Sequence, residues 1–176
     1  MTTRSRVPRG QSAKALALGV FALMSLYSVA ADAPQVVLDA SKAGPRAVER
    51  LTERSILRDY RFAWVNLAQA LESNSTVPLN GLFAGAANDW LTRAVGNQRH
   101  NGLSAHYLNQ SHKLEVVFYA PEGDVVELHD DAEYDLQIFD RDRTIHSEHV
   151  MVRYVVLMTP AADRWVIRQL QAVPQF

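Results

Sequence analysis

The spacing of the apolar residues changes once along this chain, from a helical period to strict alternation, and this change limits the fold more than any other feature. Between residues 45 and 99 apolar side chains recur every three or four positions, as in Ile56, Tyr60, Trp64 and Leu67. From residue 113 onward apolar and polar residues alternate. Helices gathered before strands predict an α+β domain in which the helices cover one face of an antiparallel sheet.

The same pattern predicts where the elements lie. We expect a long first helix that starts near Pro45 and ends before Asn74, because the polar stretch after it contains a proline. Two shorter helical pieces follow, and then four strands joined by turns. The short helices are expected at 79–83 and 86–99, and the strands at 113–119, 125–139, 146–158 and 164–173. A curved sheet wrapped on the long helix would bury the apolar face of both.

Residues 1–30 have the composition of an export signal. Four basic residues precede an uncharged stretch from Ala15 to Ala31, and Ser28-Val29-Ala30 places small residues where a signal peptidase cleaves. We expect cleavage after Ala30, a linker or arm over 31–44, and one domain over 45–176 that is periplasmic or secreted. The alternative is an uncleaved membrane anchor with the domain facing outward, because about 17 apolar residues is the lower limit for crossing a bilayer.

Composition excludes several classes of protein. The chain has no cysteine, so disulfide scaffolds, thiolate zinc sites and cysteine nucleophiles are excluded. Residues 1–30 hold four of the 18 basic residues and none of the 19 acidic ones, which leaves 14 against 19, a charge of −5. An acidic body argues against a nucleic-acid partner. The sequence also contains no phosphate-binding loop and no Gly-x-Ser-x-Gly turn.

The layout of several marker residues is specific enough to compare with a known family. The long helix carries Trp64, the last helix carries Asn88-Asp89-Trp90-Leu91, Gly102 and Tyr107 introduce the strands, and a hairpin over 152–167 closes the domain. In this layout, over residues 45–173, the chain resembles the NTF2-like superfamily, and most of all its exported or membrane-associated members, including the extracytoplasmic domain of plastid-division proteins.

This resemblance implies a cone, in which one long and two shorter helices pack on a curved antiparallel sheet. The mouth of such a cone serves in different members as an enzyme pocket, a ligand pocket or a partner-binding surface, so the fold leaves the function open. The tryptophans and tyrosines either line a cavity or fill the core, and core packing is the simpler account. We expect Trp165 to be buried against the long helix, with Ile167 and Gln169 on the same face of the last strand.

Asp130 is the polar residue that bears most on chemistry. If strand 125–139 alternates without interruption, Asp130 shares the core face with Leu128, Ala132 and Tyr134. A carboxylate there must be paired, protonated or exposed to a pocket, because an isolated buried charge costs several kcal/mol. The alternative is a β-bulge at His129-Asp130-Asp131 that turns Asp130 outward.

The six histidines raise the question of a metal site. His146 and His149 would form a ligand pair on a helix, but on a strand residues three apart point to opposite faces. The pattern around His129 is also that of a strand. We therefore expect no metal and no cofactor, and we expect His146 and Glu148 to pair at a solvated edge.

The long helix carries arginines at intervals of four. These are Arg46, Arg50, Arg54 and Arg58, with Arg61 further along. Residues four apart are neighbours on a helix, so they form one basic stripe. The stripe is either a solvated face, partly compensated by Glu49, Glu53 and Asp59, or a surface for anionic lipid or an acidic partner.

Strand 125–139 turns a mostly acidic row away from the core. The residues of this row are Glu127, His129, Asp131, Glu133, Asp135, Gln137 and Phe139. An acidic row on one element and a basic stripe on another predict association, as a homodimer or with a protein partner. Arg50, Arg54 and Arg58 on the helix and Glu133, Asp135 and Phe139 on the strand are the candidate interaction residues. A merely solvated acidic face is the alternative.

These observations favour an exported, non-enzymatic accessory or interaction domain. It would present a sheet face or the cone mouth to a protein partner or to a small apolar ligand, and it would touch a membrane only through an uncleaved anchor. The alternative is an enzyme of the isomerase, dehydratase or cyclase type. In that case Asp130 is the general base, with His106, His129 or Tyr134 as supporting donors.

Overall fold

The structure, a computed structural model, describes residues 33–174. In chain order its elements are β1 (Gln35–Asp39), α1 (Arg50–Ser73), the 3-10 helix η1 (Val77–Leu79), α2 (Gly85–His100), β2 (Leu103–Tyr119), β3 (Val126–Asp140), β4 (Arg143–Pro160) and β5 (Trp165–Val173). The α+β order agrees with the sequence prediction, with two α-helices and a 3-10 turn where three helices were expected. β1 lies within the segment expected to be a linker or arm. The export signal expected over residues 1–30 lies outside the described residues.

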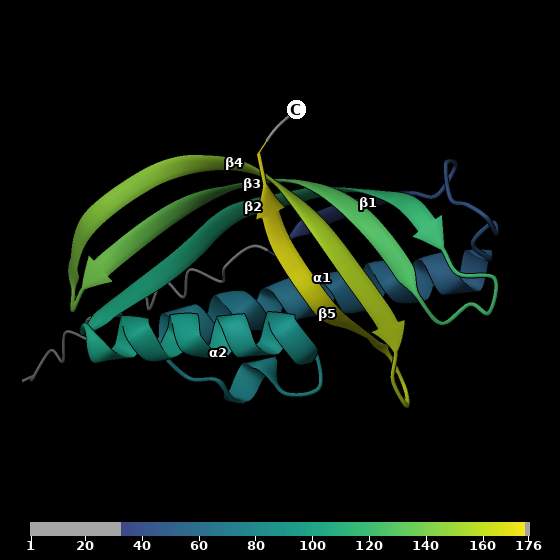
Figure 1. Ribbon diagram of the computed structural model, residues 1–176. Helices are drawn as coiled ribbons and strands as arrows, with labels where there is room; N and C mark the ends of the chain where they lie inside the picture. Colours follow the sequence, from purple (N-terminus) through teal and green to yellow (C-terminus); the bar gives the residue numbers. More distant parts are fainter. Residues whose placement is uncertain (1–32, 175–176) are drawn as a thin grey trace, which may run out of the picture. The chain divides into compact units, whose positions relative to one another are not determined.

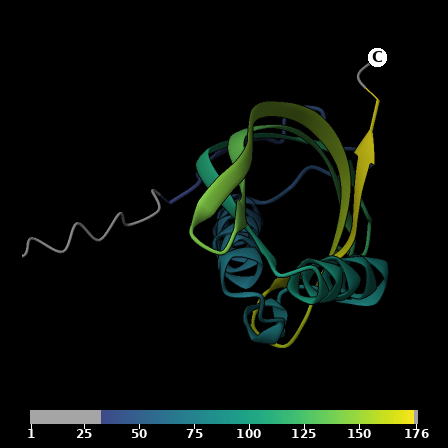
Figure 2. The same ribbon diagram turned by 90° about the vertical axis from the view of Figure 1, so that its left-hand side faces the viewer.

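The five strands form one sheet in the order β1-β2-β3-β4-β5. β1 pairs with β2 in parallel, and every later pair is antiparallel. The sheet arches over α1 and α2, which lie on its concave side (Figure 1). Seen along the helices, the strands form a deep arch, and the helices lie at its open side (Figure 2). The antiparallel sheet of the sequence prediction is therefore correct for β2 to β5, and β1 makes the whole sheet mixed.

α1 forms because its apolar residues recur on one helix face, and this face is buried. The residues buried along it include Ile56, Tyr60, Trp64, Leu67 and Leu71. The helix ends where Asn74 adopts a left-handed conformation, with φ 53°, and its N–H bonds to the carbonyl of Ala70. The predicted end is confirmed.

The predicted start of α1 near Pro45 is wrong, because the helix begins at Arg50. The residues before it extend the edge of the sheet instead. Pro45 forms a parallel bridge with Tyr119, and the Tyr119 N–H donates to the Gly44 carbonyl at 2.8 Å. Arg46 therefore lies outside the helix, where it donates to the Pro121 carbonyl at 2.8 Å and contacts Glu49.

Irregularities in the strands decide which side chains face the helices. Trp165 is buried as predicted, and its backbone N–H donates to Asp59 Oδ2 on α1 at 2.8 Å. On β5, however, the pairing with β4 shifts by one residue around Arg168, since Leu157 faces Gln169 but Met158 faces Ile167. This bulge turns Gln169 outward and Leu170 inward, so the assignment of Gln169 to the core face is wrong.

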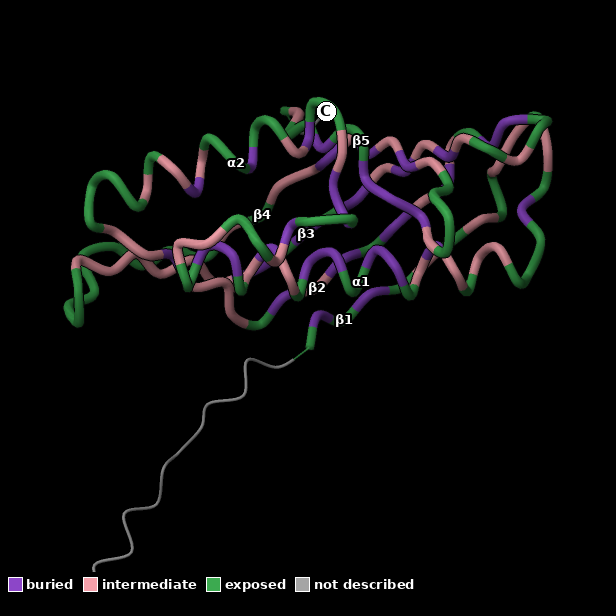
Figure 3. The backbone as a smooth tube through the Cα atoms, turned by 90° about the horizontal axis from the view of Figure 1, so that it is seen from below, coloured by how far each residue is buried: buried purple, intermediate pink, exposed green. Residues whose placement is uncertain are grey.

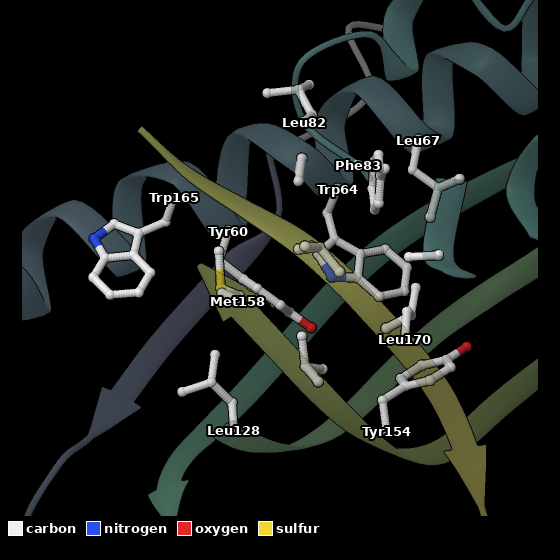
Figure 4. Packing of buried hydrophobic residues seen from close by; sticks show 14 of the residues in the cluster. Tyr60, Trp64, Leu67, Leu82, Phe83, Leu128, Tyr154, Met158, Trp165 and Leu170 are labelled. Atoms are coloured by element: carbon white, nitrogen blue, oxygen red, sulfur yellow. The ribbon is translucent and has the colours of Figure 1, made fainter. Parts of the chain in front are cut away.

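The core lies between α1, α2 and the concave face of the sheet. Buried residues run along the inner side of α1 and the middle of the strands, whereas the outer side of α2 is exposed (Figure 3). Tyr60, Trp64, Leu128 and Met158 are among the side chains packed in this core (Figure 4). None of the helices within residues 33–174 is long and apolar enough to cross a membrane.

Candidate functional site

A cavity of about 220 Å³ lies between α1, α2 and the concave face of the sheet. The helices contribute mostly apolar side chains to its lining, among them Leu67, Trp90 and Leu91. The sheet contributes Tyr107 from β2 and Tyr154 from β4, together with aliphatic residues of β3 and β5. Among residues 33–174, no carboxylate, imidazole or amine lines it. Its chemistry is therefore that of an apolar, aromatic pocket with a few neutral polar groups.

Trp64 forms the centre of an aromatic wall beside this cavity, and among the rings of this wall Trp64, Tyr107 and Tyr154 line the cavity itself. Its ring centroid lies 6.3 Å from that of Tyr60 and 5.7 Å from that of Tyr154, and Figure 4 shows it between these two side chains. Tyr107 stacks on Tyr134 with centroids 4.6 Å apart and planes within 11°. Large rigid rings in mutual contact hold the cavity wall in one arrangement.

The tyrosine hydroxyls at this wall stay protonated at neutral pH. Burial raises the pKa of Tyr154 to about 12, and it raises the pKa of Tyr107 and Tyr134 well above their usual range. The Tyr134 and Tyr154 hydroxyls lie 3.2 Å apart and share a hydrogen bond. Neutral hydroxyls of this kind orient a ligand by hydrogen bonding and carry no charge to attract an ion.

Asp130 belongs to a separate buried cluster. β3 pairs without a shift from Val126 to Ile138 in its ladder with β4, so the strand has no bulge at Asp130 and the side chain points inward. Tyr60 Oη donates to Asp130 Oδ2 at 2.6 Å, and His112 Nδ1 lies 2.8 Å from the same oxygen. All three side chains have 0% exposure. Burial and the nearby carboxylate raise the pKa of Tyr60 well above its usual range, which keeps its hydroxyl a donor.

Trp64 separates this cluster from the cavity. Its ring lies 4.3 Å, centroid to centroid, from the ring of His112, and it also lines the cavity. Tyr60, His112 and Asp130 do not line the cavity. Within residues 33–174, Trp64 Nε1, His112 Nε2 and Asp130 Oδ1 are buried without a hydrogen-bond partner. The carboxylate and imidazole thus meet each other, but a molecule in the cavity touches neither.

Comparison with known proteins supports the fold. No protein-family model and no curated protein matches the sequence. Among solved structures, the intermembrane space region of the chloroplast protein ARC6 is similar with a TM-score of 0.53 and 13% identity, over 74% of this chain and 100% of that chain. The fold is NTF2-like. LinA is also similar, with a TM-score of 0.46 and 11% identity, over 72% of this chain and 88% of that one. At such identities the likeness concerns the fold alone.

The NTF2-like cone places the other predicted catalytic residues apart from Asp130. His106 packs against Phe139 with tilted rings, whose centroids are 4.5 Å apart. His129 is half-buried on the opposite side of β3 and lies 3.8 Å from Glu127. Tyr134 points inward and hydrogen-bonds to Tyr154. The structure therefore brings neither His106 nor His129 to the carboxylate, whereas Tyr134 lies at the aromatic wall.

His112 is the partner of Asp130 that the sequence analysis missed. The strand was predicted to begin at Lys113, ten residues after the observed start at Leu103 and one residue after His112. His112 continues the inward alternation of Leu114 and Val116. Extending the strand by one position would have found it. Earlier in β2 the inward-facing residues are the odd-numbered Ala105 and Tyr107. The pairing with β3 shifts between Leu108 and Ser111, and after this shift the even-numbered residues face inward.

The acidic side chains on the outer face of β3 have more hydrogen-bonding and charged partners than the sequence implied. Arg153 donates two hydrogen bonds to Asp131, at 2.6 and 2.9 Å. His149 lies 3.1 Å from Glu133 and 2.8 Å from Asp135, which also accepts from Asn109. Phe139 is half-buried under the His106 ring. Association as a homodimer through this face stays a prediction.

The pair of His149 and Asp135 has a definite pH dependence. The hydrogen bond with Asp135 raises the pKa of His149, and the same contact lowers the pKa of Asp135. The contribution of His149 to stability is lost as the pH rises through its raised pKa, and that of Asp135 is lost as the pH falls through its lowered pKa. The contact therefore stabilises the fold between these two values. His146 and Glu148 lie 3.4 Å apart at an exposed edge, and residues 33–174 contain no cluster suited to a metal.

Proposed function

We propose that this protein is a non-enzymatic binding domain that holds a small apolar molecule in the mouth of its NTF2-like cone. The main observation that supports this proposal is the 220 Å³ cavity, whose lining is apolar and aromatic and whose titratable residues are all tyrosines. Trp90 lines it while its side chain is 47% exposed, so the lining continues to the solvent. An apolar molecule that covers such a surface removes it from water at a gain of about 25 cal/mol per Å².

The size of the cavity limits the ligand. A dry cavity of about 150 Å³ holds a benzene molecule, and drug-sized ligands need about 300 Å³ or more. A volume of 220 Å³ lies between these values. The ligand is therefore a compact hydrocarbon-like molecule, or the apolar end of a longer one. Tyr107 and Tyr154 offer hydroxyls to one neutral polar group on it.

Enzyme chemistry is the second candidate, and one observation favours it. Tyr60 and His112 converge on the Asp130 carboxylate, an arrangement suited to proton transfer. A substrate in the cavity would reach Asp130 only after Trp64 moved aside. We prefer the binding account because the cluster is sealed from the cavity. Its hydrogen bonds also need no catalytic explanation, since a carboxylate in the core needs donors whatever its function.

The test is isothermal titration of the protein with cyclohexanol. Ala94 lines the cavity from α2, so Ala94→Phe fills part of it and is expected to weaken binding about tenfold or more. Ala86→Phe, on the same helix but exposed and outside the cavity, is the matched control and should bind as the unmodified protein does. Asp130→Asn should also leave binding unchanged. Equal affinity for the Ala94 and Ala86 variants would place the ligand elsewhere.

Action outside the cytoplasm is the second part of the proposal. It is supported by the basic start, apolar stretch and small-residue site of residues 1–30. The similar structure is the intermembrane space region of ARC6. Cell fractionation with N-terminal sequencing tests it, and the expected product begins at Ala31 in the extracytoplasmic fraction. An intact membrane-bound chain would support the anchor, and an intact soluble cytoplasmic chain would refute export.

A further inference from the structure

A second hollow, of about 540 Å³, lies on the solvent side of α1, next to the turn between β4 and β5. Seven α1 residues line it, and apart from the buried Asp59 these are Arg54, Leu57, Arg58, Arg61, Phe62 and Val65. At 100° per residue these six positions fall within an arc of about 140°, so they share one helix face. This face is opposite to the face buried in the core. The hollow is therefore independent of the cavity in the cone mouth.

The wall of this groove is held in place by Asp59. Its carboxylate accepts from the Trp165 backbone N–H at 2.8 Å and from Arg58 Nε at 2.7 Å. The first bond ties the start of β5 to α1, although the two residues are 106 positions apart. Arg164 in turn binds the neighbouring Asp163. The groove is thus formed before any partner arrives, which lowers the entropic cost of binding.

The floor of the groove is apolar and exposed. The Phe62 side chain is 48% exposed and that of Val65 39% exposed, while Leu57 is half-buried beside them. Phe62 and Val65 are three residues apart and therefore neighbours on the helix surface. Apolar side chains that gather in a hollow, rather than singly on a flat surface, favour an interaction site.

Two guanidinium groups precede Phe62 and Val65 along this helix face, without a carboxylate partner in the described part of the chain. Arg54 donates to the Arg50 carbonyl and Arg61 to the Val36 carbonyl, so only backbone oxygens hold them. Arg58 and Arg164, by contrast, are compensated by Asp59 and Asp163. Arg54 and Arg61 are seven positions apart, which separates them by about 10 Å along the helix. The groove therefore carries an excess positive charge, followed along the helix by the exposed apolar side chains of Phe62 and Val65.

We propose that this groove docks an acidic segment of a partner protein, with an apolar side chain against Phe62 and Val65 and carboxylates on Arg54 and Arg61. In an extended segment, side chains two residues apart share a face at intervals of about 7 Å. Two carboxylates at alternate positions, followed by an apolar residue two positions further on, therefore follow the order of Arg54, Arg61 and Phe62 along the helix. A concave site that also contains Asp59 and Asp163 suits a peptide better than a flat anionic membrane surface. A second copy is disfavoured because the acidic residues of its sheet face are already paired with Arg153 and His149. Residues 1–30 are basic and do not match the charge.

The test is fluorescence anisotropy with a labelled synthetic peptide in which two glutamates at alternate positions are followed, two positions further on, by a leucine. We expect saturable binding that weakens as salt rises. Arg54→Ser combined with Arg61→Ser should weaken it about tenfold, because both charged contacts with the peptide are lost. Phe62→Ser should weaken it by a similar factor. Arg93→Ser combined with Arg99→Ser removes the same charge from exposed positions on α2, outside the groove, and should leave the affinity unchanged.

Several results would overturn the proposal. A peptide with lysines in place of the glutamates that binds equally well would remove the charge argument. Equal loss in the α1 and α2 double variants would mean nonspecific attraction. Binding of phosphatidylserine vesicles in place of the peptide, abolished by the α1 variant, would assign the groove to a membrane. If sedimentation shows a dimer for the unmodified protein and a monomer for the α1 double variant, the groove would be assigned to a second copy of the chain. Ala94→Phe should not affect peptide binding, so failure here and failure of the cavity proposal are distinguishable.

Discussion

Tyr60 and His112 allow Asp130 to occupy the centre of the core. The Tyr60 hydroxyl and His112 Nδ1 lie 2.6 and 2.8 Å from the same carboxylate oxygen, and Trp64 packs on the His112 ring. A buried carboxylate is tolerated when donors replace its lost water, and it becomes costly when one of them is removed. The cluster therefore contributes to stability whether or not it has a chemical role.

Removal of the Tyr60 hydroxyl tests this account. Tyr60→Phe keeps the ring but takes one donor from a fully buried carboxylate, so it should lower the free energy of unfolding by about 1.5–3 kcal/mol. Tyr119→Phe is the control, because the hydroxyl of Tyr119 has a long 3.4 Å contact with an exposed glutamate, and its loss should cost less than about 1 kcal/mol. Urea denaturation measures both. Equal small losses would show that Asp130 does not depend on Tyr60.

Sequence reasoning reached this cluster only in part. The alternation of β3 offered an inward Asp130, with an outward bulge as the alternative, because bulges leave no reliable mark in a single sequence. His112 was within reach, since it lies one position before the predicted strand. Trp64 and Tyr60 were recognised as aromatic residues of the helix, but their contacts with His112 depend on the distance between α1 and β2, which periodicity does not specify.

At the scale of elements, helical period and strand alternation were sufficient to predict α1, α2 and the four-stranded meander. β1 was missed because it has only five residues and adds to the sheet as a parallel edge strand after a short breaker-rich segment. Face assignments failed where a strand has a bulge. On β5 the extra residue at Arg168 places Leu170 in the core in place of Gln169, a change of partner that only the pairing with β4 reveals.

Trp165 shows what one correctly assigned position contributes to β5. It is 8% exposed, and its backbone is tied to α1 through Asp59. Trp165→Ala removes a large buried ring and should cost roughly 3–5 kcal/mol of unfolding free energy in guanidinium melts. Trp90→Ala is the comparison, since Trp90 is 47% exposed, and we expect less than about 1.5 kcal/mol there. A loss below about 1 kcal/mol for Trp165→Ala would contradict its place in the core.

At the scale of the whole domain, the sheet and helices enclose two environments divided by Trp64. On one side lies the apolar cavity of the cone mouth, and on the other the sealed cluster of Tyr60, His112 and Asp130. Neither could be read from the sequence, because a cavity depends on how far helices and strands remain apart when all have packed. The arginine groove on α1 lies outside both and offers a surface of different chemistry.

The most direct measurement is a methyl NMR titration of the protein with cyclohexanol. Binding in the cone mouth predicts the largest shifts at Ala94, Ala105 and Ile138, which line the cavity. It predicts no comparable shift at Leu128, which is fully buried two residues from Asp130 and does not line the cavity. Shifts centred on Leu128 would mean that the ligand passes Trp64 to the carboxylate, as an enzyme requires. That result, or a titration with no shift at the cavity methyls, would contradict the binding account.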